Sequence, residues 1–195
     1  MIVKGHDFPY VTLMGVIAAD LSLHTADFRA AERTFQLITQ AAGRAGRGTR
    51  PGEVVIQTYQ PEHYAVVHAA IQDYDGFYEL EIQLRKLQSM PPFGDLVSVT
   101  YTGQEEAAVL RGSAKFRDSL TACLRLPEYR ENQCTVLGPA PCAVPKINYN
   151  FRYRLTVRCG ATRQMRQLIA HLLRQFSQDK LNRGVNAFAD VNGYD

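Results

Sequence analysis

Apolar residues in the first sixty positions follow two different periods. Two short, mostly apolar runs, residues 11–17 and 53–57, are typical of buried parallel strands. Between them the apolar residues recur every three or four positions, which is the period of one helix face: Phe28, Ala31, Phe35, Ile38, Ala42 and Ala45. A strand, a crossover helix and a strand make a parallel unit. We therefore predict an α/β segment over residues 1–60.

The next thirty residues show the helical period alone. Their apolar face consists of Tyr64, Val67, Ile71, Tyr74, Tyr78, Ile82 and Leu87. Pro91 and Pro92 follow, and proline cannot continue a helix. We predict a helical connector over residues 61–92.

From residue 93 onward, strand and helix periods alternate. The predicted elements are strand 97–102, helix 105–124, strand 134–137, strand 151–158, helix 165–176 and strand 185–191. The apolar positions of the first helix include Ala107, Leu110, Ala114 and Leu124. The order β-α-β-β-α-β predicts a ferredoxin-like α/β domain over residues 93–195.

The composition is that of a folded protein, with 46% hydrophobic and 21% charged residues. No apolar stretch approaches the roughly 18 residues that span a bilayer, and no signal-peptide pattern opens the chain. We therefore expect a cytoplasmic protein without a membrane partner. The cysteines lack the Cys-x-x-Cys spacing of zinc sites, so we expect no metal or other cofactor in this chain: Cys123, Cys134, Cys142 and Cys159.

Positive charge gathers at the C-terminal end. Residues 146–195 carry nine Lys/Arg and three Asp/Glu, a net charge of +6, within a chain of net charge +3. In the strand 151–158 three arginines alternate with apolar residues and so share one face. Such a strip suits phosphate backbones of DNA or an acidic peptide of a partner, but it is equally compatible with an ordinary solvated face. The residues concerned are Lys146, Arg152, Arg154, Arg158, Arg163 and Arg166.

The most specific motif is Gln-Ala-Ala-Gly-Arg-Ala-Gly-Arg-Gly, residues 40–48. Arg44 and Arg47 are three positions apart, so we predict that they project from the same side of the final turns of this helix. Planar, permanently charged guanidinium groups suit a polyphosphate and stabilise charge that develops during phosphoryl transfer. The alternative is that both arginines only complement the helix macrodipole.

This motif resembles motif VI of superfamily 2 helicases, and residues 4–8, Lys-Gly-His-Asp-Phe, resemble motif V. With Gln-Thr-Tyr-Gln-Pro-Glu-His-Tyr at 57–64, Pro-Pro-Phe-Gly at 91–94 and Val-Leu-Gly-Pro-Ala-Pro at 136–141, nearly the whole chain is similar to the primosomal replication-restart DNA helicases. One departure stands near the end. The family's usual Asp-Val-Asp-Pro is replaced by Asp-Val-Asn-Gly at 190–193, which puts the role of the second acid in doubt.

The resemblance implies that residues 1–60 end the second RecA-like lobe of an ATP-driven helicase that recognises stalled or repaired forks and restarts replication. It implies ATP with Mg²⁺ in the longer protein, and zinc bound by cysteines upstream of residue 1. It also implies DNA partners (branched forks and single strands), single-stranded-DNA-binding protein and primosome proteins. By motif match, the nucleotide contacts would be Gln40, Gly43, Arg44 and Arg47, with the two arginines catalytic, and the DNA-coupling residues Lys4, Gly5, His6 and Asp7.

No Gly-x-x-x-x-Gly-Lys-Ser/Thr motif occurs in these 195 residues. We therefore expect the chain to be a fragment without ATPase activity of its own. Two alternatives stay open: a module that only binds DNA or protein, and a helicase-like scaffold that never hydrolysed ATP.

Overall fold

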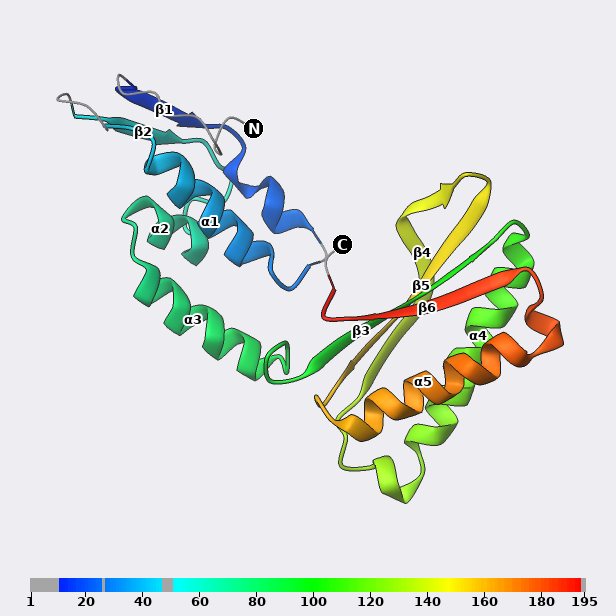
Figure 1. Ribbon diagram of the computed structural model, residues 1–195. Coiled ribbons are helices and arrows are strands. Elements are labelled where there is room, and N and C mark those ends of the chain that lie inside the picture. Colours follow the sequence, from blue (N-terminus) through cyan, green and yellow to red (C-terminus); the bar gives the residue numbers. More distant parts are fainter. Residues whose placement is uncertain (1–10, 26, 47–50, 194–195) are drawn as a thin grey trace. The chain divides into compact units, whose positions relative to one another are not determined.

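The structure is a computed structural model and describes residues 11–25, 27–46 and 51–193. The chain divides into two compact units, Met1–Leu84 and Arg85–Asp195 (Figure 1). The boundary falls inside the segment that the sequence sets apart as a connector. Each unit has a hydrophobic core of its own.

The first unit is built on a parallel pair of strands, β1 (Leu13–Val16) and β2 (Glu53–Ile56). Between them in sequence come the short 3-10 helix η1 (Ala19–His24) and the helix α1 (Ala30–Ala42). The predicted strand–helix–strand order and the parallel pairing are therefore confirmed.

Helices α2 (Tyr64–Ala70) and α3 (Tyr74–Leu87) follow, and their buried residues join those of α1 in one core. The Phe35 ring of α1 stacks on the Phe77 ring of α3 with 4.3 Å between centroids. The sequence predicted continuous helical periodicity here, but the helix is interrupted between Ala70 and Tyr74. At the interruption Gln72 has a φ of 55°, which an α-helix cannot contain.

The second unit is an antiparallel four-stranded sheet with two helices. Its strands are β3 (Asp95–Gly103), β4 (Thr135–Ile147), β5 (Asn150–Cys159) and β6 (Val185–Val191). They lie side by side in the order β4-β5-β3-β6. Helix α4 (Glu106–Leu124) connects β3 to β4, and α5 (Arg163–Gln178) connects β5 to β6 (Figure 1). The predicted element order β-α-β-β-α-β is confirmed. Two short 3-10 helices, η2 (Pro127–Tyr129) and η3 (Lys180–Asn182), follow α4 and α5.

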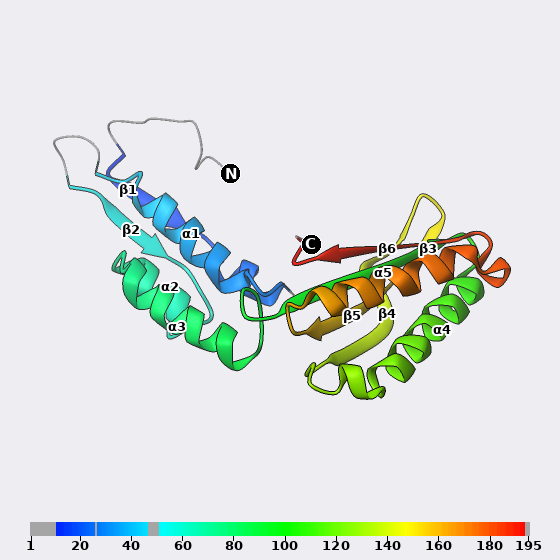
Figure 2. The same ribbon diagram turned by 60° about the horizontal axis from the view of Figure 1, so that its bottom comes forward.

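Both helices cover the same face of this sheet (Figure 2). Alternate residues of the two central strands are buried beneath them, as the period of two requires. These are Val97, Val99, Tyr101, Tyr153, Leu155 and Val157. Three aromatic rings join the layers: Tyr101 of β3 lies 5.8 Å from Phe116 of α4 and 5.5 Å from Phe176 of α5, between ring centroids. The intervening residues of the strands therefore form a second face, which we call the open face.

The buried stripe of α4 differs from the predicted one. Leu110 is 39% exposed, whereas the buried positions are Val109, Gly112, Ser113, Phe116 and Leu120. A Cβ added to Gly112 would lie 3.1 Å from two ring atoms of Phe176. The absence of a side chain at this position is what lets the α5 ring approach α4. A count of apolar residues missed this face because two of its members are Gly and Ser.

Strand β4 is also longer than predicted. The sequence ended it at residue 137, before Gly-Pro-Ala-Pro, yet it continues to Ile147 with two register shifts against β5. Proline removes a donor from a sheet, but it is tolerated at edges and bulges. Because β4 is an edge strand, it accommodates Pro139, Pro141 and Pro145.

The close approach at Gly112 can be tested by filling it. Gly112→Val should lower the free energy of unfolding by about 1–3 kcal/mol, because overpacking forces Phe176 to move. The measurement is urea denaturation followed by circular dichroism. Arg111→Val is the matched control, since the Arg111 side chain is 66% exposed on the same helix. Equal stability of the two variants would contradict this account of the helix contact.

Candidate nucleic-acid interface

Three arginines project from the open face of the sheet. Arg152, Arg154 and Arg158 alternate along β5 with the buried Tyr153, Leu155 and Val157. In the neighbouring strand they stand opposite Thr102, Thr100 and Leu96, respectively. Strand residues two apart share a face, so the side chains form one row, and the predicted common orientation is confirmed.

Among the described residues, the arginines at the two ends of this row form weak hydrogen bonds with neutral groups. Arg152 Nη1 donates a hydrogen bond to the carbonyl oxygen of Val144 at 3.3 Å, and Arg158 Nη2 lies 3.5 Å from Thr135 Oγ1. Within the described residues, no carboxylate forms an ion pair with either one. The part of the chain that the structure describes therefore leaves their positive charge without a neutralising carboxylate. Arg154, between them, has its Nε buried.

An aromatic side chain accompanies the arginine row. Phe188 of β6 is 53% exposed and stands opposite Thr100, which in turn stands opposite Arg154. It therefore lies on the open face, in the same cross-strand line as the central arginine. Phe188 was not among the residues predicted from the sequence. Its position on the open face could have been predicted, because Phe188 is out of phase with the buried Val185 and the limits of this strand were predicted correctly.

The other predicted basic residues do not join this row. Arg163 and Arg166 lie on α5, which covers the opposite face of the sheet. Lys146 stands opposite Phe151, with its Nζ 4.2 Å from the centroid of that ring. Phe151 is in phase with the buried residues of β5 and out of phase with Arg152. The structure thus brings together three of the six basic residues and separates the other three.

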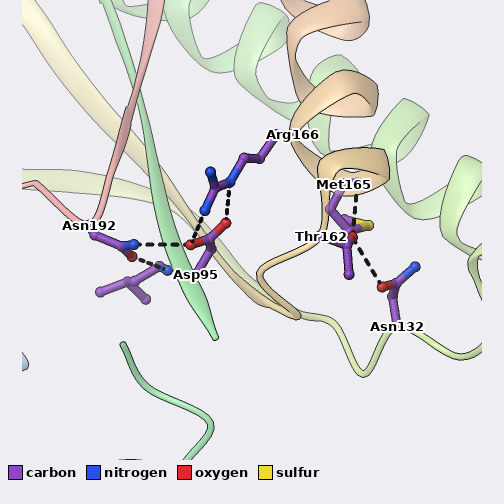
Figure 3. A network of polar contacts seen from close by, with 7 residues as sticks. Asp95, Asn132, Thr162, Met165, Arg166 and Asn192 are labelled. Carbon is purple, nitrogen blue, oxygen red and sulfur yellow. Dashed lines mark hydrogen bonds and ion pairs between the residues drawn. The ribbon is translucent and has the colours of Figure 1, made fainter. Parts of the chain in front are cut away.

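Arg166 is instead part of a polar network at one end of the sheet (Figure 3). Its Nε and Nη2 donate to the Asp95 carboxylate at 2.6 and 3.0 Å. Asn192 Nδ2 donates to the same carboxylate at 3.0 Å, and Asn192 Oδ1 accepts from the Leu96 amide at 2.8 Å. The network therefore ties together the start of β3, the end of β6 and the first turns of α5.

Asp95 is the buried centre of this network, with its side chain 2% exposed, whereas that of Arg166 is 54% exposed. The hydrogen bonds from Arg166 lower the pKa of the Asp95 carboxyl below its ordinary 3.8, and the bond from Asn192 adds to this against the opposing effect of burial. Asp95 was not among the site residues predicted from the sequence. The sequence did contain an indication of its role, because Asp95 is an acidic residue in phase with the apolar Val97, Val99 and Tyr101. A charged side chain on a buried strand face needs a hydrogen-bonding or oppositely charged partner.

Asn192 replaces the acid that the resemblance led us to expect at this position. The amide serves the site in two ways, since its oxygen accepts from the backbone and its NH₂ donates to Asp95. A carboxylate at position 192 could not donate to Asp95, and it would place a second negative charge beside it.

The motif of residues 40–48 lies at the C-terminal end of α1, but not as predicted. The helix ends at Ala42, so Arg44 lies in the turn that follows and not on a helical face. The amide of Gly46 donates to the carbonyl of Val11, and Gly46 has a φ of 74°, a conformation that favours glycine. A Cβ on Gly46 would lie 2.9 Å from the backbone nitrogen of Gly52. The glycine therefore lets two backbone segments meet at the start of the parallel strands.

Around this turn, Gln40 and Gly43 are exposed and Arg44 is half-buried. The amide and the guanidinium group fit a polyphosphate in chemistry, because both donate hydrogen bonds and the arginine is permanently charged. Arg47 and the predicted motif V residues Lys4, Gly5, His6 and Asp7 lie outside the described residues. Their assignments stay predictions.

Within residues 11–25, 27–46 and 51–193, no helix is long and apolar enough to cross a bilayer, and no group of three His, Cys, Asp or Glu side chains is arranged to bind a metal ion.

Comparison with known proteins gives a consistent result. A family model described as "Primosomal protein N C-terminal domain" matches residues 86–193. The replication restart protein PriA of Bacillus subtilis is 38% identical over 194 residues, which are 100% of this chain and 23% of that protein. PriA of Synechocystis is 39% identical over a region that covers 81% of this chain and 18% of the Synechocystis protein. PriA of Treponema pallidum is 36% identical over a region that covers 98% of this chain and 28% of the Treponema protein. The chain thus spans less than a third of these relatives.

The Asp95 network makes a prediction about stability and pH. Asp95→Asn should lower the free energy of unfolding by about 2 kcal/mol at pH 7, because it weakens hydrogen bonds to a charged group. The lowered pKa means that the carboxylate contributes fully above its ordinary value of 3.8, and that this contribution is lost as the pH falls through the lower folded-state value. The deficit of the variant should therefore shrink at acidic pH.

Urea titrations between pH 2.5 and 7 would measure this deficit. Asp118→Asn is the control, because Asp118 is 67% exposed and, among the described residues, forms its ion pair with the neighbouring Arg117. It should change the free energy of unfolding by at most about 0.5 kcal/mol at any pH. A pH-independent deficit for Asp95→Asn would show that the carboxylate charge is unimportant.

Proposed function

This chain belongs to the replication restart protein PriA family, and on that basis we propose that it is part of an ATP-dependent DNA helicase. That helicase recognises stalled or repaired replication forks and restarts replication by primosome assembly. The observation that carries the proposal is the similarity along the whole chain to replication restart proteins. Because the chain spans less than a third of those proteins, the activity is proposed for the longer protein and not for this chain alone.

We assign the first unit to the end of a RecA-like lobe, supported by its parallel strand–helix–strand order. Gln40, Gly43, Arg44 and Arg47 would face the phosphates of ATP bound with Mg²⁺ by the rest of the protein. ATP supplies the phosphoryl group whose transfer drives translocation, and the arginines stabilise the charge that develops. Lys4–Asp7 would couple the nucleotide state to DNA. Zinc bound through upstream cysteines stays a prediction of the resemblance.

The second unit, whose element order is ferredoxin-like, would bind DNA through its open face. Arg152 and Arg158 offer unneutralised charge to phosphates, and Phe188 offers a ring on which an unpaired base can stack. Such contacts do not read sequence, which suits a protein that acts wherever a fork has stopped. Branched forks and single strands are therefore the proposed DNA partners, in the cytoplasm.

A second candidate is a DNA- or protein-binding module without catalytic activity. It is favoured for the isolated chain by the separate core of the second unit and by the lack of a P-loop in the sequence. Arg163 is exposed on α5, on the face away from the arginine row, and would suit an acidic peptide of a partner. Single-stranded-DNA-binding protein and primosome proteins are the proposed partners.

The motif after α1 can be tested in the longer protein. Arg47→Ala should lower the ATP turnover rate by roughly 10³-fold or more while leaving DNA affinity nearly unchanged, because a finger arginine acts on the transition state. Arg44→Ala should also impair turnover. Arg33→Ala is a control on the same helix, because Arg33 pairs with Asp27 at 2.7 Å. Normal DNA-stimulated turnover in the Arg44 and Arg47 variants would refute their proposed role.

The open face can be tested in this chain. Each neutralised phosphate contributes about −0.9 to the slope of log affinity against log salt concentration. If the three arginines each contact one phosphate, together they should contribute roughly −3 to this slope. Replacing Arg152, Arg154 and Arg158 together by alanine should flatten the slope by that amount. Titration of labelled fork DNA at several salt concentrations measures it.

The control variant removes the same charge from the helical layer, by alanine at Arg111, Arg125 and Arg174, which are all exposed. It should leave most of the slope intact. Should the two triple variants lose affinity equally, DNA binding would reflect net charge and not the open face. Unchanged binding by the open-face variant would favour the protein-docking alternative.

A further inference from the structure

Two cysteine thiols meet at the base of the β4–β5 hairpin. Cys159 is the last residue of β5, and Cys134 directly precedes β4. Thr135 pairs with Arg158, so Cys134 and Cys159 are the next opposite residues of the two strands. Their thiols are hydrogen-bonded to each other. Directly opposite residues of antiparallel strands have Cα atoms about 4.5–5.5 Å apart, which lies within the range of about 4.4–6.8 Å found for disulfides.

The two thiols differ in exposure and in acidity. Cys159 is 2% exposed within the core of the second unit, and Cys134 is half-buried at its margin. The hydrogen bond from Cys159 lowers the pKa of the Cys134 thiol. The same contact, together with burial and the nearby Asp95, raises the pKa of Cys159. Oxidant-sensitive cysteines are accessible, readily deprotonated and placed beside a second thiol. Cys134 meets these conditions, with Cys159 as the second thiol.

We propose that Cys134 and Cys159 form a modification site for hydroperoxides, which convert the pair into an intramolecular disulfide. The Cys134 thiolate attacks one peroxide oxygen, the O–O bond breaks, and Cys134 becomes a sulfenic acid. The Cys159 sulfur then attacks the Cys134 sulfur, the S–O bond breaks, and hydroxide leaves as water with the Cys159 proton. The two thiols lose two electrons, and hydrogen peroxide is reduced to two molecules of water. A dithiol reductant reverses the change.

The disulfide would cross-link the open end of the β4–β5 hairpin, which carries the arginine row. It closes the loop formed by residues 134–159, which contains all of β4 and β5. Closing a loop of this length removes conformational freedom from the unfolded chain. The oxidised protein should therefore melt at a higher temperature than the reduced one, by roughly 5–15 °C.

The test treats the full chain with hydrogen peroxide at low protein concentration, which disfavours bonds between chains. Mass spectrometry should find a loss of about 2 Da that dithiothreitol reverses, and proteolytic mapping should find a Cys134–Cys159 cross-link. Differential scanning calorimetry compares the melting temperatures before and after oxidation. Cys134→Ser and Cys159→Ser should each abolish the mass loss and the thermal shift. Cys123→Ser and Cys142→Ser are matched controls and should retain both.

Cys134→Ser is the more informative variant, because its half-buried position tolerates a hydroxyl better than the buried position of Cys159. Circular dichroism checks that each variant is folded. Oxidation of Cys134 to a sulfinic acid without a cross-link would overturn the proposal. A cross-link that leaves the melting temperature unchanged or lowers it would also overturn it, because the geometry would then not be that of a staple.

Discussion

The second unit depends on the fact that a β-strand has two faces and that both helices lie on one of them. Residues in phase with Val99 and Leu155 are buried beneath α4 and α5. Residues out of phase, among them Arg152, Arg154 and Arg158, are left on the open face. The same alternation thus produces the hydrophobic core and the row of charge. A one-residue slip of β5 would exchange the two sets and destroy both at once.

Most of the fold could be predicted because it rests on local periods. Strand β6 was predicted with its observed limits, and the predicted helix 165–176 lies within α5. The misses have physical causes. Gly112 and Ser113 are buried because a neighbouring ring needs room, not because they are apolar. Strand β4 passes through three prolines because it lies at an edge, and edge position is a property of the sheet order.

The site was harder to predict, because its contacts join residues far apart in sequence. Asp95 and Asn192 are 97 positions apart and meet only when β3 and β6 pair. Cys134 and Cys159 lack any motif spacing and meet only through the register of β4 and β5. The turn after α1 was recognised as a motif, yet its helical geometry was wrong because the helix ends before Arg44. Composition and spacing therefore identified candidate residues, and strand register determined their neighbours.

The register also changes what the C-terminal charge means. A net charge of +6 over residues 146–195 suggests one broad basic surface. The guanidinium groups of this region, however, lie on different faces of the sheet and have different partners. Arg166 Nε donates a hydrogen bond to the buried Asp95 carboxylate at 2.6 Å, so the charge of this arginine stabilises the sheet from the side that the helices cover. Within the described residues, Arg152 and Arg158 form hydrogen bonds with neutral groups on the open face and no ion pair with a carboxylate. Because an arginine already paired with a buried acid has little left for a phosphate, the binding capacity of this region should scale with the arginines of the open face and not with its net charge.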